Sequence, residues 1–227
     1  MNAKSMAGWI GFAGILMLII GMIDSGVWPE HPSFSDRRAR NNHNDSSDDD
    51  DRDNDGGFAY RPVRGWNGAC VAGERFAATD CNRKLIGARY YNVGWGGDAG
   101  IRARFPYEFL SARDYDGHGT HTASTAGGNQ RVTVTGDAAA FGTISGIAPR
   151  ARIAAYKALW HDIEGGTASG GSVDLVSAIE DAVADGVDVI NYSVSGTSTD
   201  FAADVEVAFM FAADAGVFVA ASAGNSG

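Results

Sequence analysis

The alternation of strand-like and helix-like segments between residues 152 and 221 constrains the fold more than any other feature of this chain. Segments rich in apolar residues at 152–158, 187–194 and 217–221 are typical of strands. The two stretches between these segments place apolar residues at helical spacing. Strands that alternate with helices in this way form a parallel sheet with right-handed crossovers. The sequence therefore predicts an α/β fold.

Candidate capping residues mark the ends of the two helices. Ser172 is the expected N-cap of the first helix and Gly186 its end, whereas Asp200 and Gly216 delimit the second. Each helix carries one apolar face, formed by Val173, Val176, Ile179 and Val183 in the first and by Phe201, Val205, Ala208, Phe209 and Ala212 in the second. A further helix of small residues is expected at 119–126.

An uncharged run at residues 5–23 leads into Asp24-Ser25-Gly26. Residues 1–18 fit three interpretations: an extension of a core strand, a signal sequence or anchor, and a membrane-spanning helix. We favour the first, because cleavage nearby would cut into the strand predicted at 15–23, and we do not expect a membrane protein. An aspartate at the carboxyl end of such a strand lies at the ligand-facing edge of an open sheet. Asp24 is thus a candidate functional residue, with an ordinary turn aspartate as the alternative.

Residues 36–57 form a polar, low-complexity loop that holds many of the acidic residues behind the formal net charge of −10. This acidic balance argues against nucleic acid as a partner. Asp51, Asp53 and Asp55 match the first half of a calcium-binding loop, but Pro62 stands where the closing glutamate belongs. A solvated acidic loop is the preferred interpretation and a calcium site the alternative. No cofactor is expected to be required.

The long loop at 58–113 is rich in aromatic residues, arginine and glycine, and it contains both cysteines, Cys70 and Cys81. Two thiols alone do not make a structural zinc site. A local disulfide is the preferred interpretation, and two reduced, buried thiols are the alternative. A disulfide would indicate an oxidising compartment.

His118 lies between two glycines in the stretch 116–124, directly before the helix of small residues. Glycine lets the backbone turn, and we expect the two glycines to let a substrate approach closely. An imidazole titrates near neutral pH and can act as general base and then as general acid. Taken alone, His118 is better explained as a core histidine. His118 and His121 could also share a metal on one helical face, but the glutamate of a zinc-peptidase helix is missing between them.

Three motifs follow one another along the chain: Asp24-Ser25-Gly26, Gly117-His118-Gly119-Thr120-His121 and Ala223-Gly224-Asn225-Ser226-Gly227. In this order they resemble the subtilisin-like serine proteases, or subtilases. Stretches at 23–30, 81–89, 116–124 and 185–190 are similar to the cucumisin-like branch known from plants. The resemblance covers about residues 19–227 and implies a catalytic domain of three αβα layers around a mostly parallel sheet. It also implies an extracellular protein.

The resemblance implies a role for each matching residue. His118 would be the general base, Asp24 would orient it, and Asn225 would donate its amide to the oxyanion. A polypeptide substrate in extended conformation would pair with the segment Ser193, Val194, Ser195 and Gly196. The same segment, together with Ser222, Ala223 and Gly224, would wall the pocket for the residue before the scissile bond. The sequence predicts no oligomeric state.

Two departures from the family pattern limit these expectations. The family's nucleophile lies in a Gly-Thr-Ser-Met-Ala motif, which does not occur here, and Gly196-Thr197-Ser198-Thr199 is not expected to replace it. We therefore expect the first part of a serine endopeptidase domain, inactive alone, with a non-catalytic peptide- or calcium-binding remnant as the alternative. In bacterial subtilisins an aspartate after His-Pro binds calcium, whereas Ser33 occupies that position here.

Overall fold

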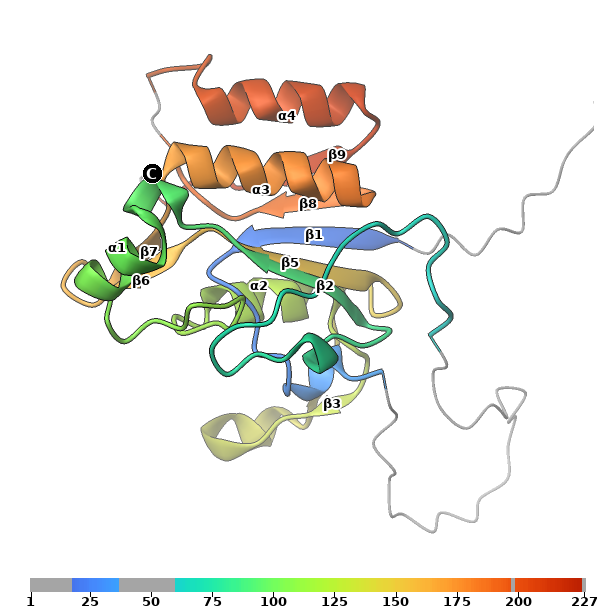
Figure 1. Cartoon of the computed structure of the whole chain (residues 1–227). Helices are drawn as coiled ribbons and strands as arrows, with labels where there is room; N and C mark the ends of the chain where they lie inside the picture. The colour runs from blue at the N-terminus through green and yellow to red at the C-terminus, as the bar shows by residue number, and fades with distance from the viewer. Residues whose placement is uncertain (1–17, 37–59, 197–198, 226–227) are drawn as a thin grey trace, which may run out of the picture.

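The computed structural model describes residues 18–36, 60–196 and 199–225 (Figure 1). Its centre is a five-stranded sheet in the order β2-β5-β1-β8-β9, and all four pairings are parallel. The strands are β1 (Ile19–Asp24), β2 (Leu85–Tyr90), β5 (Arg152–Lys157), β8 (Val189–Tyr192) and β9 (Phe218–Ala221). The predicted α/β fold with a mostly parallel sheet is confirmed.

Helices cover both faces of this sheet. The helices α3 (Ser172–Asp185) and α4 (Asp204–Asp214) lie on one face, and α2 (His118–Gly127) lies on the other (Figure 1). The side chains of β1 alternate between the two cores, so that Ile19 and Ile23 pack towards α3 whereas Ile20 and Met22 pack towards α2. A strand buried on both faces reads as one continuous apolar run, as the sequence of β1 does. The three-layer αβα arrangement follows.

Smaller elements decorate this framework. The helix α1 (Gly97–Arg104) precedes the loop that leads to α2. Two short antiparallel hairpins are formed by β6 (Trp160–Asp162) with β7 (Thr167–Ser169) and by β3 (Val132–Thr133) with β4 (Thr143–Ile144). Short 3₁₀ helices occupy Pro32–Phe34, Ala78–Asp80, Val93–Trp95 and Gly136–Phe141.

Two of the predicted N-caps are wrong. Ser172 is the first residue of α3 and Gly171 is its N-cap, whereas α4 begins only after Ala203. Asp200 instead accepts a hydrogen bond from the amide of Ala202 at 3.0 Å, a local turn that competes with helix formation. Phe201 consequently lies outside the helix, and 89% of its surface is exposed. The expected membership of Phe201 in the apolar face is therefore also wrong.

The C-terminal ends of both helices agree with the sequence. Gly186 is the C-cap of α3 with φ of 93°, and Gly216, with φ of 89°, directly follows Ala215, the C-cap of α4. Positive φ is accessible to glycine at low cost, which explains why both helices stop there. The strands predicted at 152–158, 187–194 and 217–221 are shorter than expected. The strand β1 begins at Ile19, and residues 15–17 of the predicted strand lie outside the described ranges. Within the described ranges, no helix is long and apolar enough to cross a membrane.

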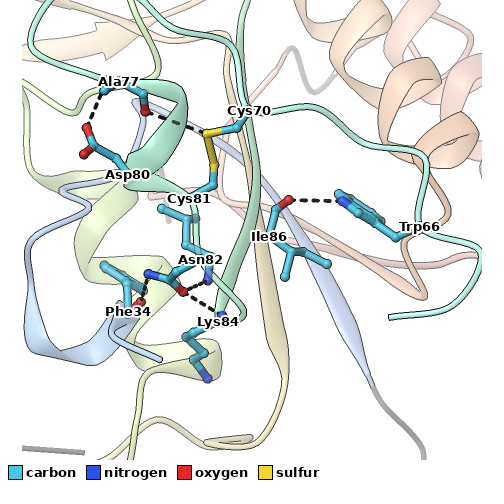
Figure 2. Close-up of a disulfide and its surroundings, with 10 residues drawn as sticks. Phe34, Trp66, Cys70, Ala77, Asp80, Cys81, Asn82, Lys84 and Ile86 are labelled. Carbon is cyan, nitrogen blue, oxygen red and sulfur yellow. Dashed lines mark hydrogen bonds between the residues drawn. A yellow bond between two sulfur atoms is a disulfide. The ribbon is translucent and has the colours of Figure 1, made fainter. Parts of the chain in front are cut away.

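Cys70 and Cys81 form a disulfide with an S–S distance of 2.04 Å (Figure 2). The predicted disulfide is confirmed, and the alternative of two reduced thiols is wrong. The loop around it is anchored on the sheet, because Trp66 donates its indole N–H to the carbonyl of Ile86 in β2 at 3.1 Å. Phe76 is buried against the α2 side of the core. The disulfide thus closes a local loop, and the backbone bridge between Cys70 and Ala88 joins this loop to β2.

Candidate active site

Asp24 and His118 meet at the carboxyl edge of the sheet. Asp24 is the last residue of β1 and is 1% exposed, and His118 is the first residue of α2. The Nδ1 atom of His118 lies 2.7 Å from Oδ1 of Asp24. The carboxylate also accepts hydrogen bonds from the amide of Ser25 at 2.7 Å and from the hydroxyl of Thr122 at 3.0 Å. The buried carboxylate of Asp24 therefore orients the imidazole ring of His118, whose side chain is 46% exposed.

The environment raises the pKa of both groups in this pair. Burial raises the pKa of Asp24, and the hydrogen bonds from His118, Ser25 and Thr122 offset this only in part. Burial lowers the pKa of His118, but the hydrogen bond and the charge of Asp24, assisted by Asp116 and Asp114, outweigh it and leave the pKa raised. The pair consequently holds a proton more strongly than an isolated histidine, as a base that must take up a proton requires.

Asp114 fixes the start of α2 although it lies outside the helix. One of its carboxylate oxygens accepts the Ser25 hydroxyl and the Gly117 amide, both at 2.9 Å. The other accepts the amide and the hydroxyl of Thr120, at 2.8 and 2.6 Å. Asp114 thereby supplies the capping oxygen that Gly117, the N-cap residue, lacks. The sequence analysis missed this residue, although an aspartate shortly before a helix start is a signal for such a cap.

The glycines around His118 serve close packing and turn geometry. A Cβ on Gly119 would lie 2.2 Å from the carbonyl oxygen of Gly26, so that α2 can approach the turn after β1 only with glycine at this position. Gly117 has φ of 95°, which favours glycine. We expected these glycines to admit a substrate. At Gly119 the neighbour is instead the protein's own backbone.

The two segments that the resemblance assigns to substrate binding lie side by side after β8 and β9. The amide of Ser222 donates to the carbonyl of Tyr192 at 3.0 Å, and its hydroxyl donates to the carbonyl of Val194 at 3.4 Å. A Cβ on Gly224 would lie 3.1 Å from the hydroxyl of Ser195. Because β8 pairs in parallel with β1, these segments and the exposed Asn225 belong to the same carboxyl edge of the sheet as Asp24.

The structure bears on the metal alternatives only within the described ranges. Asp51, Asp53 and Asp55 lie outside them, as do Thr197 and Ser198. Among the described residues, no three His, Cys, Asp or Glu side chains form a group that could hold a metal ion. Nδ1 of His118 is engaged by Asp24, and His121 is an exposed residue of α2. The donor set around His118 therefore does not fit the metal-peptidase alternative.

Comparisons with known proteins agree with these features. A sequence profile of the subtilase family matches residues 17–227. Subtilisin-like protease SBT3.3 of Arabidopsis thaliana is 41% identical over 92% of this chain and 25% of its own length, and subtilisin-like protease SBT1.5 of the same plant is 41% identical over 92% and 24%. The solved structure of the epidermin leader peptide processing serine protease EpiP from Staphylococcus aureus shares the fold, with a TM-score of 0.50 and 17% identity over 92% of this chain and 38% of that one.

The chain spans about a quarter of the length of the curated relatives that it matches. The family profile nevertheless extends over nearly all described residues, and the relatives match across 92% of the chain. The chain belongs to the subtilase family, and its resemblance to the plant subtilisin-like proteases is confirmed.

Proposed function

We propose that this chain contributes the base and its orienting carboxylate to a serine endopeptidase site. The observation that carries the proposal is the 2.7 Å contact between Nδ1 of His118 and the buried Asp24, which leaves the rest of the ring half-exposed. In such a site the Nε2 atom of the ring takes the proton of a serine hydroxyl as that oxygen attacks a peptide carbonyl. The same proton then passes to the leaving amine, while the aspartate stabilises the imidazolium.

The substrate of this site is a polypeptide in extended conformation. The residues 193–196 supply main-chain groups for pairing with such a strand, and the neighbouring 222–224 wall the pocket for the residue before the scissile bond. Asn225 donates its side-chain amide to the oxyanion. Loss of one such donor costs roughly 3 kcal/mol of transition-state stabilisation in a subtilisin. The disulfide supports an extracellular, oxidising location.

The nucleophilic serine of the family lies in a Gly-Thr-Ser-Met-Ala segment, and no such segment occurs among the 227 residues. We therefore expect no serine labelling when the chain alone is treated with a fluorophosphonate probe. Labelling of a single serine in the unmodified chain would contradict this part of the proposal.

The catalytic role of His118 is tested in a chain extended by the corresponding downstream segment of a relative that carries the motif. The extended protein should cleave peptides and take up the probe, and His118→Ala should lower the turnover number at least about a thousandfold. His121→Ala is the matched control, because this histidine lies on the same helix without contacting Asp24. Peptide binding without turnover in the extended protein would favour the non-catalytic alternative.

A further inference from the structure

A second histidine is connected to His118 through one carboxylate. Nδ1 of His161, in β6, lies 2.5 Å from Oδ2 of Asp116. The other oxygen of Asp116 accepts the backbone amide of His118 at 3.0 Å. The side chains of His161 and Asp116 are both mostly buried, at 21% and 15% exposed. Asp116 is therefore a bridge between the ring of His161 and the first amide of α2.

His161 is itself held firmly in place. Its amide donates to Oε1 of Glu108 at 2.7 Å, and its carbonyl accepts the hydroxyl of Tyr107 at 2.9 Å. Its ring packs beside the rings of Tyr107 and Tyr115, with centroid distances of 6.4 and 5.7 Å. A side chain fixed by its backbone and by two aromatic neighbours can orient a carboxylate that lies within hydrogen-bond reach.

The same network returns to the other member of the pair. Oε2 of Glu108 accepts the ammonium of Lys157 at 2.7 Å, and both side chains are fully buried. Lys157 pairs with Asp24 in the register of β1 and β5, and the next amide, that of Ala158, donates to the carbonyl of Asp24 at 3.0 Å. His161 is thus linked to His118 through Asp116 and to the backbone of Asp24 through Glu108 and Lys157.

We propose that His161 is a positioning residue for His118 and that it acts by donating its Nδ1–H to Asp116. This inference rests on the proposed role of His118 as the base. Held in this way, Asp116 keeps one oxygen on the amide of His118 and its negative charge beside the ring. Five charged side chains from the surrounding elements face the linked groups: Asp24, Asp114, Asp116, Glu108 and Lys157.

The test compares three variants of the full chain. His161→Phe keeps an aromatic ring beside Tyr107 and Tyr115 but removes the donor. His161→Gln keeps a donor, and Asp116→Asn removes the charge while keeping an acceptor for the His118 amide. For each variant, NMR of ¹³C-labelled histidine rings gives the pKa of His118, and hydrogen exchange reports on its amide. Thermal unfolding shows whether the fold persists.

Asp116→Asn should lower the pKa of His118, because it removes a negative charge that favours the imidazolium. His161→Phe should lower it in the same direction but by less, and should speed exchange of the His118 amide. His161→Gln should restore both values towards those of the wild type. If His161→Phe does not fold, the comparison of Asp116→Asn with His161→Gln still decides whether Asp116 acts on His118.

Three results would overturn the proposal. If His161→Phe leaves the pKa of His118 and the exchange rate of its amide unchanged, His161 has only a structural role. Equal effects of the Phe and Gln variants would assign the effect to ring packing rather than to the donor. A rise in the pKa of His118 would mean that His161 acts as an opposing cation. None of these measurements needs turnover, so an inactive extended protein would count against the proposed function alone.

Discussion

Two regions of the molecule are built in opposite ways: the corner, where Asp24 at the end of β1 meets Asp114 and the start of α2, and the outer edge formed by α4 and β9. At the corner, polar side chains are buried and paired: Asp24 and Asp114 are each 1% exposed, and each accepts several hydrogen bonds. At the edge, the large apolar side chains of Met210, Phe211 and Phe218 are each about 70% exposed.

The difference shows which part of the molecule specifies its own geometry. Buried polar networks that are fully satisfied hold one arrangement of their groups. An exposed apolar edge gains little from any particular arrangement of its side chains, and it is prone to pair with other chains. The corner is therefore expected to be sensitive to single substitutions, and the edge is expected to tolerate them.

Lys157→Met should have the largest effect, because it leaves the fully buried Glu108 without its cation. Breaking a buried ion pair on one side costs about 3–5 kcal/mol of unfolding free energy. Urea denaturation measures this cost. The double variant Lys157→Met/Glu108→Gln should recover part of it, since the uncompensated charge is gone. A double variant no more stable than the single one would show that the charge is not what matters.

Gly119→Ala should come next. The new Cβ would meet the carbonyl oxygen of Gly26, and α2 would have to move away from β1. Overpacking of this kind costs roughly 1–3 kcal/mol. Gly165→Ala is the matched control, because a Cβ there would lie 3.5 Å or more from its neighbours. Equal stability of the two variants would contradict the close contact between α2 and the turn after β1.

The dependence of stability on pH should report the contact between His118 and Asp24. The folded pKa of His118 is raised above its ordinary value of 6.5. Stability from this contact is therefore fully present below pH 6.5 and is lost as the pH rises through the folded pKa. The half-exposed ring is screened by solvent, so the effect should be below about 1 kcal/mol.

The unfolding free energies of the wild type and of His118→Gln, compared between about pH 6 and 9 so as to cover the ordinary imidazole pKa and the range above it, measure this contribution. The stability difference between the two proteins should shrink as the pH rises. A difference that grows with pH would mean that the folded pKa is lowered rather than raised.

Phe218→Thr, at the sheet edge, should have the smallest effect. Threonine suits a strand, and the side chain that it replaces is mostly exposed, so the unfolding free energy should change by no more than about 0.5 kcal/mol. Sedimentation should show less self-association than in the wild type, because the apolar edge is reduced. A loss of stability comparable to that of Gly119→Ala would show that the edge is as tightly specified as the corner.

Features read from neighbouring residues in the sequence were predicted well. The apolar-rich segments identified β1, β5, β8 and β9, and Gly186 and Gly216 marked where the helices end. The strand β2 was missed, because Leu85–Tyr90 lies in the stretch that was expected to be a long loop. The N-caps at Ser172 and Asp200 failed because Gly171 and Ala203 precede the helices, and a capping side chain is only one of several ways to begin a helix.

The ordered motifs placed Asp24 and His118 together, although 94 positions separate them. This was possible because both belong to family motifs, and because a parallel sheet brings the ends of its strands to one edge. Neither Asp114 nor His161 belongs to such a motif, and the motif that contains Asp116 does not show which side chain this aspartate pairs with. Their partners lie up to 89 positions away, and an acidic residue or a histidine in a loop most often simply faces solvent.

Local residue patterns were thus sufficient for the fold class and for the C-terminal ends of the helices, and the family motifs identified the candidate base with its carboxylate. Tertiary structure was needed to show which carboxylates hold that base, because hydrogen bonds between distant segments depend on distances that no local pattern encodes. It also assigned Gly119 to close packing rather than to substrate access, since only the folded backbone brings Gly26 against α2.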